Sequence, residues 1–518
     1  MRFGRITAVL SALTLLTGSM AAYPASAAAK GSGDIDENGR AEIADAILLA
    51  RWLAEDTDIT VTAQGLLNAD LTGDGQVTTD DSAKLLRLLA GADDDDLPPA
   101  ERRSVDLLAD VTPGNVQKGD PSDAAFRKAQ SKFSADLLRQ LQADEQDKNK
   151  NLLVSPVSVS LALGMTVNGA KGDTLAEMQK VLGDDLTAEQ LNAYYAGWSD
   201  QLLSPREQRE YRYDDNGDSY VTSVSSSPVT LANAIWIRDD EDLIHVPEQF
   251  LQTTADYYRA GAYKAPFDQT TVKEINSWCD ENTHHMIPEV IQALAPEDIM
   301  VLANALTFED AWKTIYEEYF VRDGRFTAAN GESRDVKMMF SNEDRYISDG
   351  TASGFIKPYR DPRYSFAAVL PNEDVSLDDY IASLDGEKLT KLLDSKESCL
   401  VEAAMPKFKF DYSVTMNDAL KALGMPAAFL ADTADFTGLN DAEGIKTWIG
   451  KVIHKTHIDV SETGTKAAAV TAVIMAGGCG IEPEVKTVTL DRPFLFMILD
   501  NQTDLPIFIG TVKDIQAE

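Results

Sequence analysis

Two oxygen-rich loops near the N-terminus have the spacing of calcium ligands. Each loop places oxygen-bearing side chains at positions one, three, five, nine and twelve around a glycine at position six. Hard oxygen ligands in this pattern bind Ca²⁺, because the glycine allows a sharp bend and position seven adds a backbone carbonyl. We therefore expect two structural Ca²⁺ ions, and the hydroxyl of Thr72 should make the second site the weaker one. The candidate ligands are Asp34, Asp36, Asn38, Arg40, Glu42 and Asp45 in the first loop, and Asp70, Thr72, Asp74, Gln76, Thr78 and Asp81 in the second.

Each calcium loop is followed by a short apolar segment, residues 46–54 and 82–90, which predicts one helix after each loop. Position twelve is Asp in both loops, where EF-hands usually carry Glu. These features resemble a dockerin, the module that attaches cellulosomal proteins to cohesins on a scaffoldin. The resemblance implies a small all-α dockerin of two EF-hand-like loop–helix repeats over residues 30–91, and a calcium-stabilised module without a partner is the alternative. It also implies a cohesin-binding face made of Ile43, Ala44, Ala50, Arg51, Thr79, Asp80, Leu86 and Arg87.

Residues 460–480 form a second segment of unusual composition, dominated by small and β-branched residues between glycines. Drawn as a strand, it places Thr465, Ala467 and Ala469 on one face and the charged Lys466 on the other. The first of these faces could enter the interior of a sheet. On these residues alone, an Ala-rich helix or linker is equally compatible.

The motifs around this segment resemble those of serpins, protease inhibitors that insert a cleaved loop into their own β-sheet. Residues 462–469 resemble the hinge of the serpin reactive-centre loop, and residues 490–498 resemble the C-terminal serpin signature. Further motifs follow in the family's order at residues 151–158, 168–172, 304–312, 358–359, 370–371, 405–408 and 454–456. The resemblance covers roughly residues 121–518. It implies an α+β serpin fold with three β-sheets, about nine helices and an exposed reactive-centre loop.

The serpin resemblance also implies roles for individual residues. Counting along the loop places cleavage after Gly478 or after Cys479, and both scissile bonds stay open. The small residues there, with no Arg or Lys, favour subtilisin-like or elastase-like serine proteases over trypsin-like ones, and papain-like cysteine proteases are a further option. The implied hinge comprises Glu462, Gly464, Thr465, Ala467, Ala468 and Ala469, and the implied shutter and breach comprise Ser155, Ser158, Asn304, Trp312 and His454.

The sequence predicts an inhibitor rather than an enzyme. It contains neither a GxSxG nor an HExxH motif, and its five histidines lack zinc-site spacing. The hinge residues that must point inward are small, which favours true inhibition by covalent trapping and loop insertion. A non-inhibitory or substrate-like serpin, acting as a cohesin-binding structural component, is the alternative.

The N-terminus predicts secretion. Arg2 and Arg5 precede a short apolar run and a small-residue cleavage site, so residues 1–29 have the features of a signal peptide. Residues 92–120 are acidic and contain prolines, which predicts a mobile linker between the dockerin and the serpin domain over 121–518. A formal net charge of −37 argues against nucleic-acid and anionic-membrane partners. We expect an extracellular, cellulosome-associated monomer.

Overall fold

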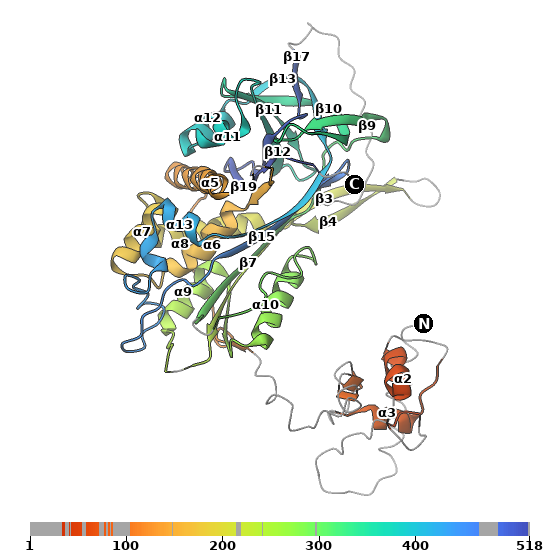
Figure 1. The fold of residues 1–518 in the computed structure, drawn as a ribbon, viewed down its shortest axis with the longest axis vertical. Helices are drawn as coiled ribbons and strands as arrows, with labels where there is room; N and C mark the ends of the chain where they lie inside the picture. Colours follow the sequence, from red (N-terminus) through yellow and green to blue (C-terminus); the bar gives the residue numbers. More distant parts are fainter. Residues whose placement is uncertain are drawn as a thin grey trace, which may run out of the picture. The chain divides into compact units, whose positions relative to one another are not determined.

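The chain divides into two compact units, Met1–Glu101 and Arg102–Glu518 (Figure 1). The computed structural model describes residues 34–36, 41, 43–53, 59–71, 77–78, 81–82, 84–85, 104–147, 149–213, 219–240, 242–295, 298–465 and 485–515. The predicted signal peptide and the first part of the predicted linker lie outside these residues. Among the described helices, none combines the length and apolarity needed to cross a membrane.

The described residues of the first unit include the helices α2 (Ile43–Leu53) and α3 (Ala63–Ala69). Residues 81–82 and 84–85 are helical as well, where the sequence predicts a helix at 82–90. Helix α2 begins at residue 43 and not at the expected residue 46, so Asp45 lies in its first turn, where free N–H groups favour a carboxylate. Helix α3 was not predicted; it starts at the Thr62 cap, whose hydroxyl accepts a hydrogen bond from Gly65 N at 2.9 Å. The buried core of this unit consists of Ile35, Ala46, Leu49, Ala69, Leu71 and Leu85.

The second unit combines many helices with large sheets. Its described helices are α5 (Ala124–Asp144), α6 (Pro156–Val167), α7 (Gly172–Gly183), α8 (Ala188–Leu203), α9 (Glu248–Tyr258), α10 (Gln269–Asn282), α11 (Leu377–Ala382), α12 (Gly386–Asp394), α13 (Asn417–Leu423) and the 3₁₀ helices η2 (Glu318–Phe320) and η3 (Pro426–Phe429).

The strands form a nine-stranded sheet, two four-stranded sheets and a hairpin. The large sheet has the order β17 (Val485–Thr489), β13 (Glu397–Pro406), β10 (Ser333–Ser348), β11 (Ala352–Pro358), β12 (Tyr364–Pro371), β18 (Phe494–Asp500), β19 (Leu505–Val512) and β2 (Leu152–Val154), with β9 (Val321–Thr327) paired to β10. The four-stranded sheets have the orders β1 (Val105–Asp106), β6 (Gly261–Ala265), β5 (Val229–Arg238), β7 (Met300–Phe308) and β14 (Phe408–Thr415), β15 (Ile453–Val460), β16 (Gly464–Thr465), β8 (Asp310–Ala311).

The two four-stranded sheets adjoin along a boundary between β7 and β15, which we call the seam. A single parallel bridge, Leu302 to Val452, crosses it within the described residues. In the nine-stranded sheet, the long strand β10 pairs with β9 at residues 333–339, with β13 at 338–346 and with β11 at 346–348. Its register with β13 shifts between Glu343 and Arg345. Apart from the two-stranded hairpin, the described strands form three sheets, as expected. The nine α-helices described in the second unit also match the predicted number.

Helix α6 occupies the centre of the second unit. Its sequence contains no charged residue, and all twelve of its residues are buried. A helix that is apolar on every side is stable only when it is surrounded by other elements. Helix α6 accordingly contacts β5, β7 and β19. Hydrogen bonds from Ser155 and Ser158 to His454 and Asn304 place its N-terminus at the seam.

The prediction of a mobile linker is wrong for residues 104–120. Strand β1 in this segment pairs with β6, Leu107 N donates to Ala262 O at 2.7 Å, and Gly119 N donates to Ala193 O at 2.8 Å. The approach to α8 is close, because a Cβ atom added at Gly197 would lie 2.0 Å from Gly119 O. Leu107 and Leu108 pack against the core, so this segment belongs to the second unit despite its linker-like composition.

An insertion follows α8. It forms an antiparallel hairpin of β3 (Arg206–Tyr213) and β4 (Ser219–Ser226). Residues 214–218, between these two strands, lie outside the described residues. The hairpin ends close to the seam, since Glu309 N, one residue before β8, donates to Pro228 O at 2.9 Å.

Candidate functional site

The first hinge residues form a two-residue strand at one end of the seam. Gly464 pairs with Ala311, and Thr465 pairs with Asp310 on one side and Val460 on the other. Strand β8 follows β7 after one residue, so β16 lies between the continuation of β7 and strand β15. Gly464 has a φ of 153°, which disfavours residues with a side chain. The hinge therefore begins as a strand antiparallel to both neighbours.

Thr465 points inward, as the alternation predicts. Only 3% of its surface is exposed, and its hydroxyl lies 2.6 Å from the hydroxyl of Tyr359. The other predicted hinge residues, Ala467, Ala468 and Ala469, and the predicted reactive centre, Gly478 and Cys479, lie outside the described residues.

The turn before β16 is held by backbone and side-chain donors. Trp312 N donates to Thr463 O at 3.0 Å, Tyr316 N donates to Glu462 O at 2.9 Å, and Trp312 Nε1 donates to Ser461 O at 2.8 Å. Glu462 also forms an ion pair with Lys407. Burial alone would raise the pKa of Glu462, but the Lys407 ammonium outweighs it and the pKa is lowered.

Trp312, predicted as a breach residue, forms the centre of an aromatic cluster. Its ring stacks on Tyr359 with centroids 4.6 Å apart and an interplanar angle of 16°. Beside it, the buried Asp310 carboxylate accepts hydrogen bonds from Asp361 N at 2.8 Å and Ala311 N at 2.9 Å. Burial nonetheless raises the pKa of Asp310 to about 6. Tyr316, Tyr359 and Asp310 were not predicted as site residues, although Tyr359 lies in a quoted motif.

The predicted shutter residues meet beneath the seam. Ser155, the cap of α6, donates its backbone N–H to His454 Nε2 on β15 at 3.1 Å. The Ser155 hydroxyl accepts from Ser158 N at 3.2 Å, and the Ser158 hydroxyl donates to Asn304 on β7. Asn304 donates in turn to Asn233, a residue that the sequence analysis missed because its role depends on the β5–β7 register. One polar network thus connects both sides of the seam to α6.

His454 is buried, and burial lowers the pKa of its imidazole to about 4. It is therefore neutral near physiological pH. Its Nε2 already accepts the Ser155 N–H, so this nitrogen is unsuited to act as a general base. The structural role implied by the resemblance fits this environment.

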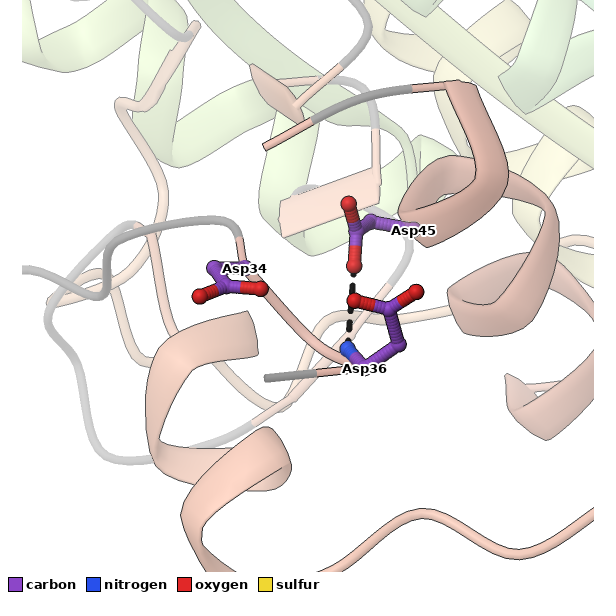
Figure 2. A group of neighbouring side chains, drawn as sticks. All are labelled: Asp34, Asp36 and Asp45. Carbon is purple, nitrogen blue, oxygen red and sulfur yellow. Dashed lines mark hydrogen bonds between the residues drawn. The ribbon is translucent and has the colours of Figure 1, made fainter. Parts of the chain in front are cut away.

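Three of the predicted calcium ligands lie together in the first unit (Figure 2). Asp34, Asp36 and Asp45 each offer a carboxylate oxygen, and these oxygens lie within 4.8 Å of one another. Asp45 is buried and accepts hydrogen bonds from Ile35 N at 2.7 Å and Asp36 N at 3.0 Å. A set of convergent carboxylates suits Ca²⁺, which prefers oxygen ligands.

The second predicted calcium loop is described only in part. Asp81 is buried and accepts a hydrogen bond from Thr78 N at 2.8 Å, and Asp70 caps the end of α3. The buried position-twelve carboxylates Asp45 and Asp81 are thus common to both loops. The remaining predicted ligands, Asn38, Arg40, Glu42, Thr72, Asp74 and Gln76, lie outside the described residues.

The predicted cohesin-binding residues of the first repeat lie on the exposed side of α2. Ile43 is 69% exposed, and Ala44, Ala50 and Arg51 are exposed as well. Ile47, which is 55% exposed, extends this side and was missed, although its helical spacing from Ile43 could have identified it. Thr79, Asp80, Leu86 and Arg87 lie outside the described residues.

Comparisons with known proteins agree with this geometry. The family described as Serpin (serine protease inhibitor) matches residues 128–515. A serpin-like protein of Thermococcus kodakarensis is 30% identical over 388 residues, 74% of this chain and 84% of the relative. The leukocyte elastase inhibitor of Xenopus tropicalis is 30% identical over 390 residues, 73% and 96% of the two chains. The crystal structure of tengpin, a thermophilic serpin, in the native state has a TM-score of 0.70 at 39% identity over 80% of this chain and 100% of that one. Over its second unit, this chain belongs to the serpin family of serine protease inhibitors.

Proposed function

We propose that this protein traps serine proteases covalently and inserts its cleaved reactive-centre loop into the seam. The observation that carries the proposal is the position of Gly464 and Thr465, which already pair with β15 and β8 at the end of the seam. The loop that follows begins from this strand. It can therefore extend between β7 and β15 without first finding its register.

The backbone hydrogen bonding at the seam favours insertion of the cleaved loop. Strands β7 and β15 share one described bridge, so separating them breaks few backbone hydrogen bonds. An inserted strand pairs with neighbours on both sides and buries its inward side chains. The opposing term is the network of Ser158, Asn304 and His454, which must rearrange as the seam opens. The uncleaved protein is held in this closed arrangement until a protease cuts the loop.

We assign the target class from the small residues at the predicted reactive centre, Gly478 and Cys479. Proteases with small or shallow specificity pockets, subtilisin-like or elastase-like, accept such residues, and papain-like cysteine proteases are a further candidate. The name of the leukocyte elastase inhibitor, a relative at 30% identity, supports this assignment.

The trapping proposal is tested by mixing the protein with subtilisin or pancreatic elastase. A complex of higher mass that survives denaturing electrophoresis is expected, together with a cleaved form that melts well above the intact form. Loop cleavage without a stable complex, and without a rise in melting temperature, would contradict the proposal. That result would support the alternative, a substrate-like serpin that serves as a structural component.

For the first unit, we propose a dockerin that binds two Ca²⁺ ions and attaches the inhibitor to a cohesin. The convergent carboxylates of Asp34, Asp36 and Asp45 support the ion site, and the exposed apolar residues Ile43 and Ile47 support a partner surface. An isolated helix gains nothing from exposing isoleucines to water, whereas a partner can bury them. The proposed role is the protection of a secreted, extracellular cellulosome from proteolysis.

The attachment is tested by calorimetric titration with Ca²⁺ and then with a panel of cohesins. We expect cohesin binding that requires Ca²⁺ and that Ile43→Asp with Ile47→Asp abolishes, while Leu67→Asp, an exposed residue on α3, leaves binding intact. Equal binding by all variants would place the contact elsewhere. Ca²⁺ binding without any cohesin contact would leave only a structural module.

A further inference from the structure

A buried ion pair lies beside the hinge and has no part in the proposed function so far. The Lys357 ammonium on β11 lies 2.8 Å from Glu343 Oε1 on β10, and the two side chains are 2% and 6% exposed. Buried ion pairs are costly to desolvate and contribute little net stability. The role of this pair is therefore to be sought in the residues that it contacts.

The Lys357–Glu343 pair lies next to Trp312 and Tyr316, the aromatic residues that bind the turn before the hinge. The Lys357 ammonium lies 4.3 Å from the ring centroid of Tyr316 and 5.5 Å from that of Trp312. Glu343 Oε1 also accepts a hydrogen bond from the Ser341 hydroxyl at 2.6 Å, and this hydroxyl lies 3.3 Å from the Tyr316 hydroxyl. Tyr316 is therefore fixed at its ring face and at its hydroxyl.

Trp312 and Tyr316 are also the residues that donate to the carbonyls of residues 461–463, immediately before β16. We propose that the Lys357–Glu343 pair positions Trp312 and Tyr316 so that the turn at residues 461–463 stays fixed while the loop inserts. The pair therefore acts as a positioning pair, through these two residues. The inference rests on the proposed trapping function.

The effect of the pair on the turn can be separated from its effect on the stability of the fold. Removing one partner leaves a buried, unpaired charge and should destabilise the fold as well as the turn. Replacing both partners with neutral side chains of similar length removes the charge penalty but also the cation–π contacts. Lys357→Met with Glu343→Gln does this, and the amide oxygen of the introduced glutamine can still accept the Ser341 hydrogen bond. This double variant should melt near the wild-type temperature and still hold the turn poorly.

The first test needs no protease. Hydrogen exchange of the full chain should be about tenfold faster at the amides of Trp312, Tyr316 and Gly464 in the double variant. The control is Lys513→Met, which removes a lysine that is 1% exposed and paired with Asp378, and it should leave these amides unchanged. Unchanged exchange at residues 312–316 and 461–464 in the double variant would overturn the inference.

The second test measures inhibition. With subtilisin or elastase, the double variant should need several times more inhibitor per protease trapped, because slower insertion gives the acyl-enzyme time to hydrolyse. Lys513→Met should match the wild type after correction for its own stability. If the wild type forms no complex, the trapping function fails, and the exchange experiment still decides whether the pair holds the turn. If the double variant traps protease as efficiently as the wild type, the pair has no positioning role.

Discussion

Thr465 is the residue at which a single charge should convert the inhibitor into a substrate. Thr465→Glu places a carboxylate at a position that is 3% exposed and paired with Asp310. Lysine or arginine there could pair with the Asp310 carboxylate, whereas glutamate cannot. Because residue 465 is already buried in the intact protein, we expect the charge to release it from the sheet before cleavage. Insertion must then bury the new side chain again, either ionised, beside a buried acid, or protonated.

The free-energy cost of burying this glutamate is set by the less costly alternative, which is protonation. Protonating a glutamate of ordinary pKa, about 4.3, costs about 4 kcal/mol at pH 7.5 and about 1.6 kcal/mol at pH 5.5. These values correspond to roughly thousandfold and fifteenfold slower insertion if the whole cost falls on the insertion step. Below pH 6, protonation of Asp310 further reduces the repulsion, since the pKa of this carboxyl is about 6.

The assay is the amount of inhibitor needed to abolish the activity of subtilisin or elastase, measured at pH 7.5 and 5.5. Thr465→Gln is the control, because it has the same shape without the charge. We expect Thr465→Glu to be cleaved as a substrate at pH 7.5 and to recover inhibition at pH 5.5 relative to Thr465→Gln. The burial of residue 465 on insertion would be refuted if the two variants inhibited equally well at pH 7.5. It would also be refuted if Thr465→Glu lost inhibition to the same extent at both pH values.

Four further predictions concern titration, calcium and packing. The pKa of His454 is lowered to about 4, so stability should fall by up to about 3 kcal/mol as the pH drops from about 6.5 to 4, and His454→Gln should remove this loss in acid melts. Asp310, whose pKa is raised, has the opposite sign: stability rises as the pH falls from about 6 towards 3.8, and Asp310→Asn should abolish that rise. Asp45→Asn should weaken Ca²⁺ binding at the first loop in calorimetric titrations, while Leu67→Ala, at an exposed position outside the ligand set, should not. Gly197→Ala should destabilise the second unit by about 1–3 kcal/mol and make residues 104–120 sensitive to limited proteolysis, because its Cβ meets Gly119 O; unchanged cleavage would contradict that contact.

Local patterns in the sequence anticipated much of this architecture. The oxygen spacing at residues 34–45 predicts convergent ligands, and the small residues after Gly464 predict a segment able to enter a sheet. Both inferences rest on short-range physics, because side-chain size and period act within one element. Helix α3 was missed because seven residues carry too little periodicity, and its start depends on the Thr62 cap.

The composition of residues 104–120 led to the wrong prediction of a mobile linker. Proline, glycine and mixed charge are typical of linkers, yet this segment pairs with β6 and packs on α8. Contact with a surface formed elsewhere in the chain supplies the hydrogen-bond partners that the segment lacks by itself. No pattern within the segment reports that surface.

The sequence by itself determined the family, the small-residue segment after Gly464, the calcium-ligand spacing and the inward position of Thr465. Only the tertiary structure decided that Thr465 already pairs with β8 and β15, that Asn233 completes the shutter, and that Lys357 and Glu343 meet beside Tyr316. The reason is physical: composition and period are properties of neighbours along the chain. Pairing across the seam joins Ser158 to Asn304 and Ser155 to His454, and contacts between residues so distant in sequence exist only once the whole chain has packed.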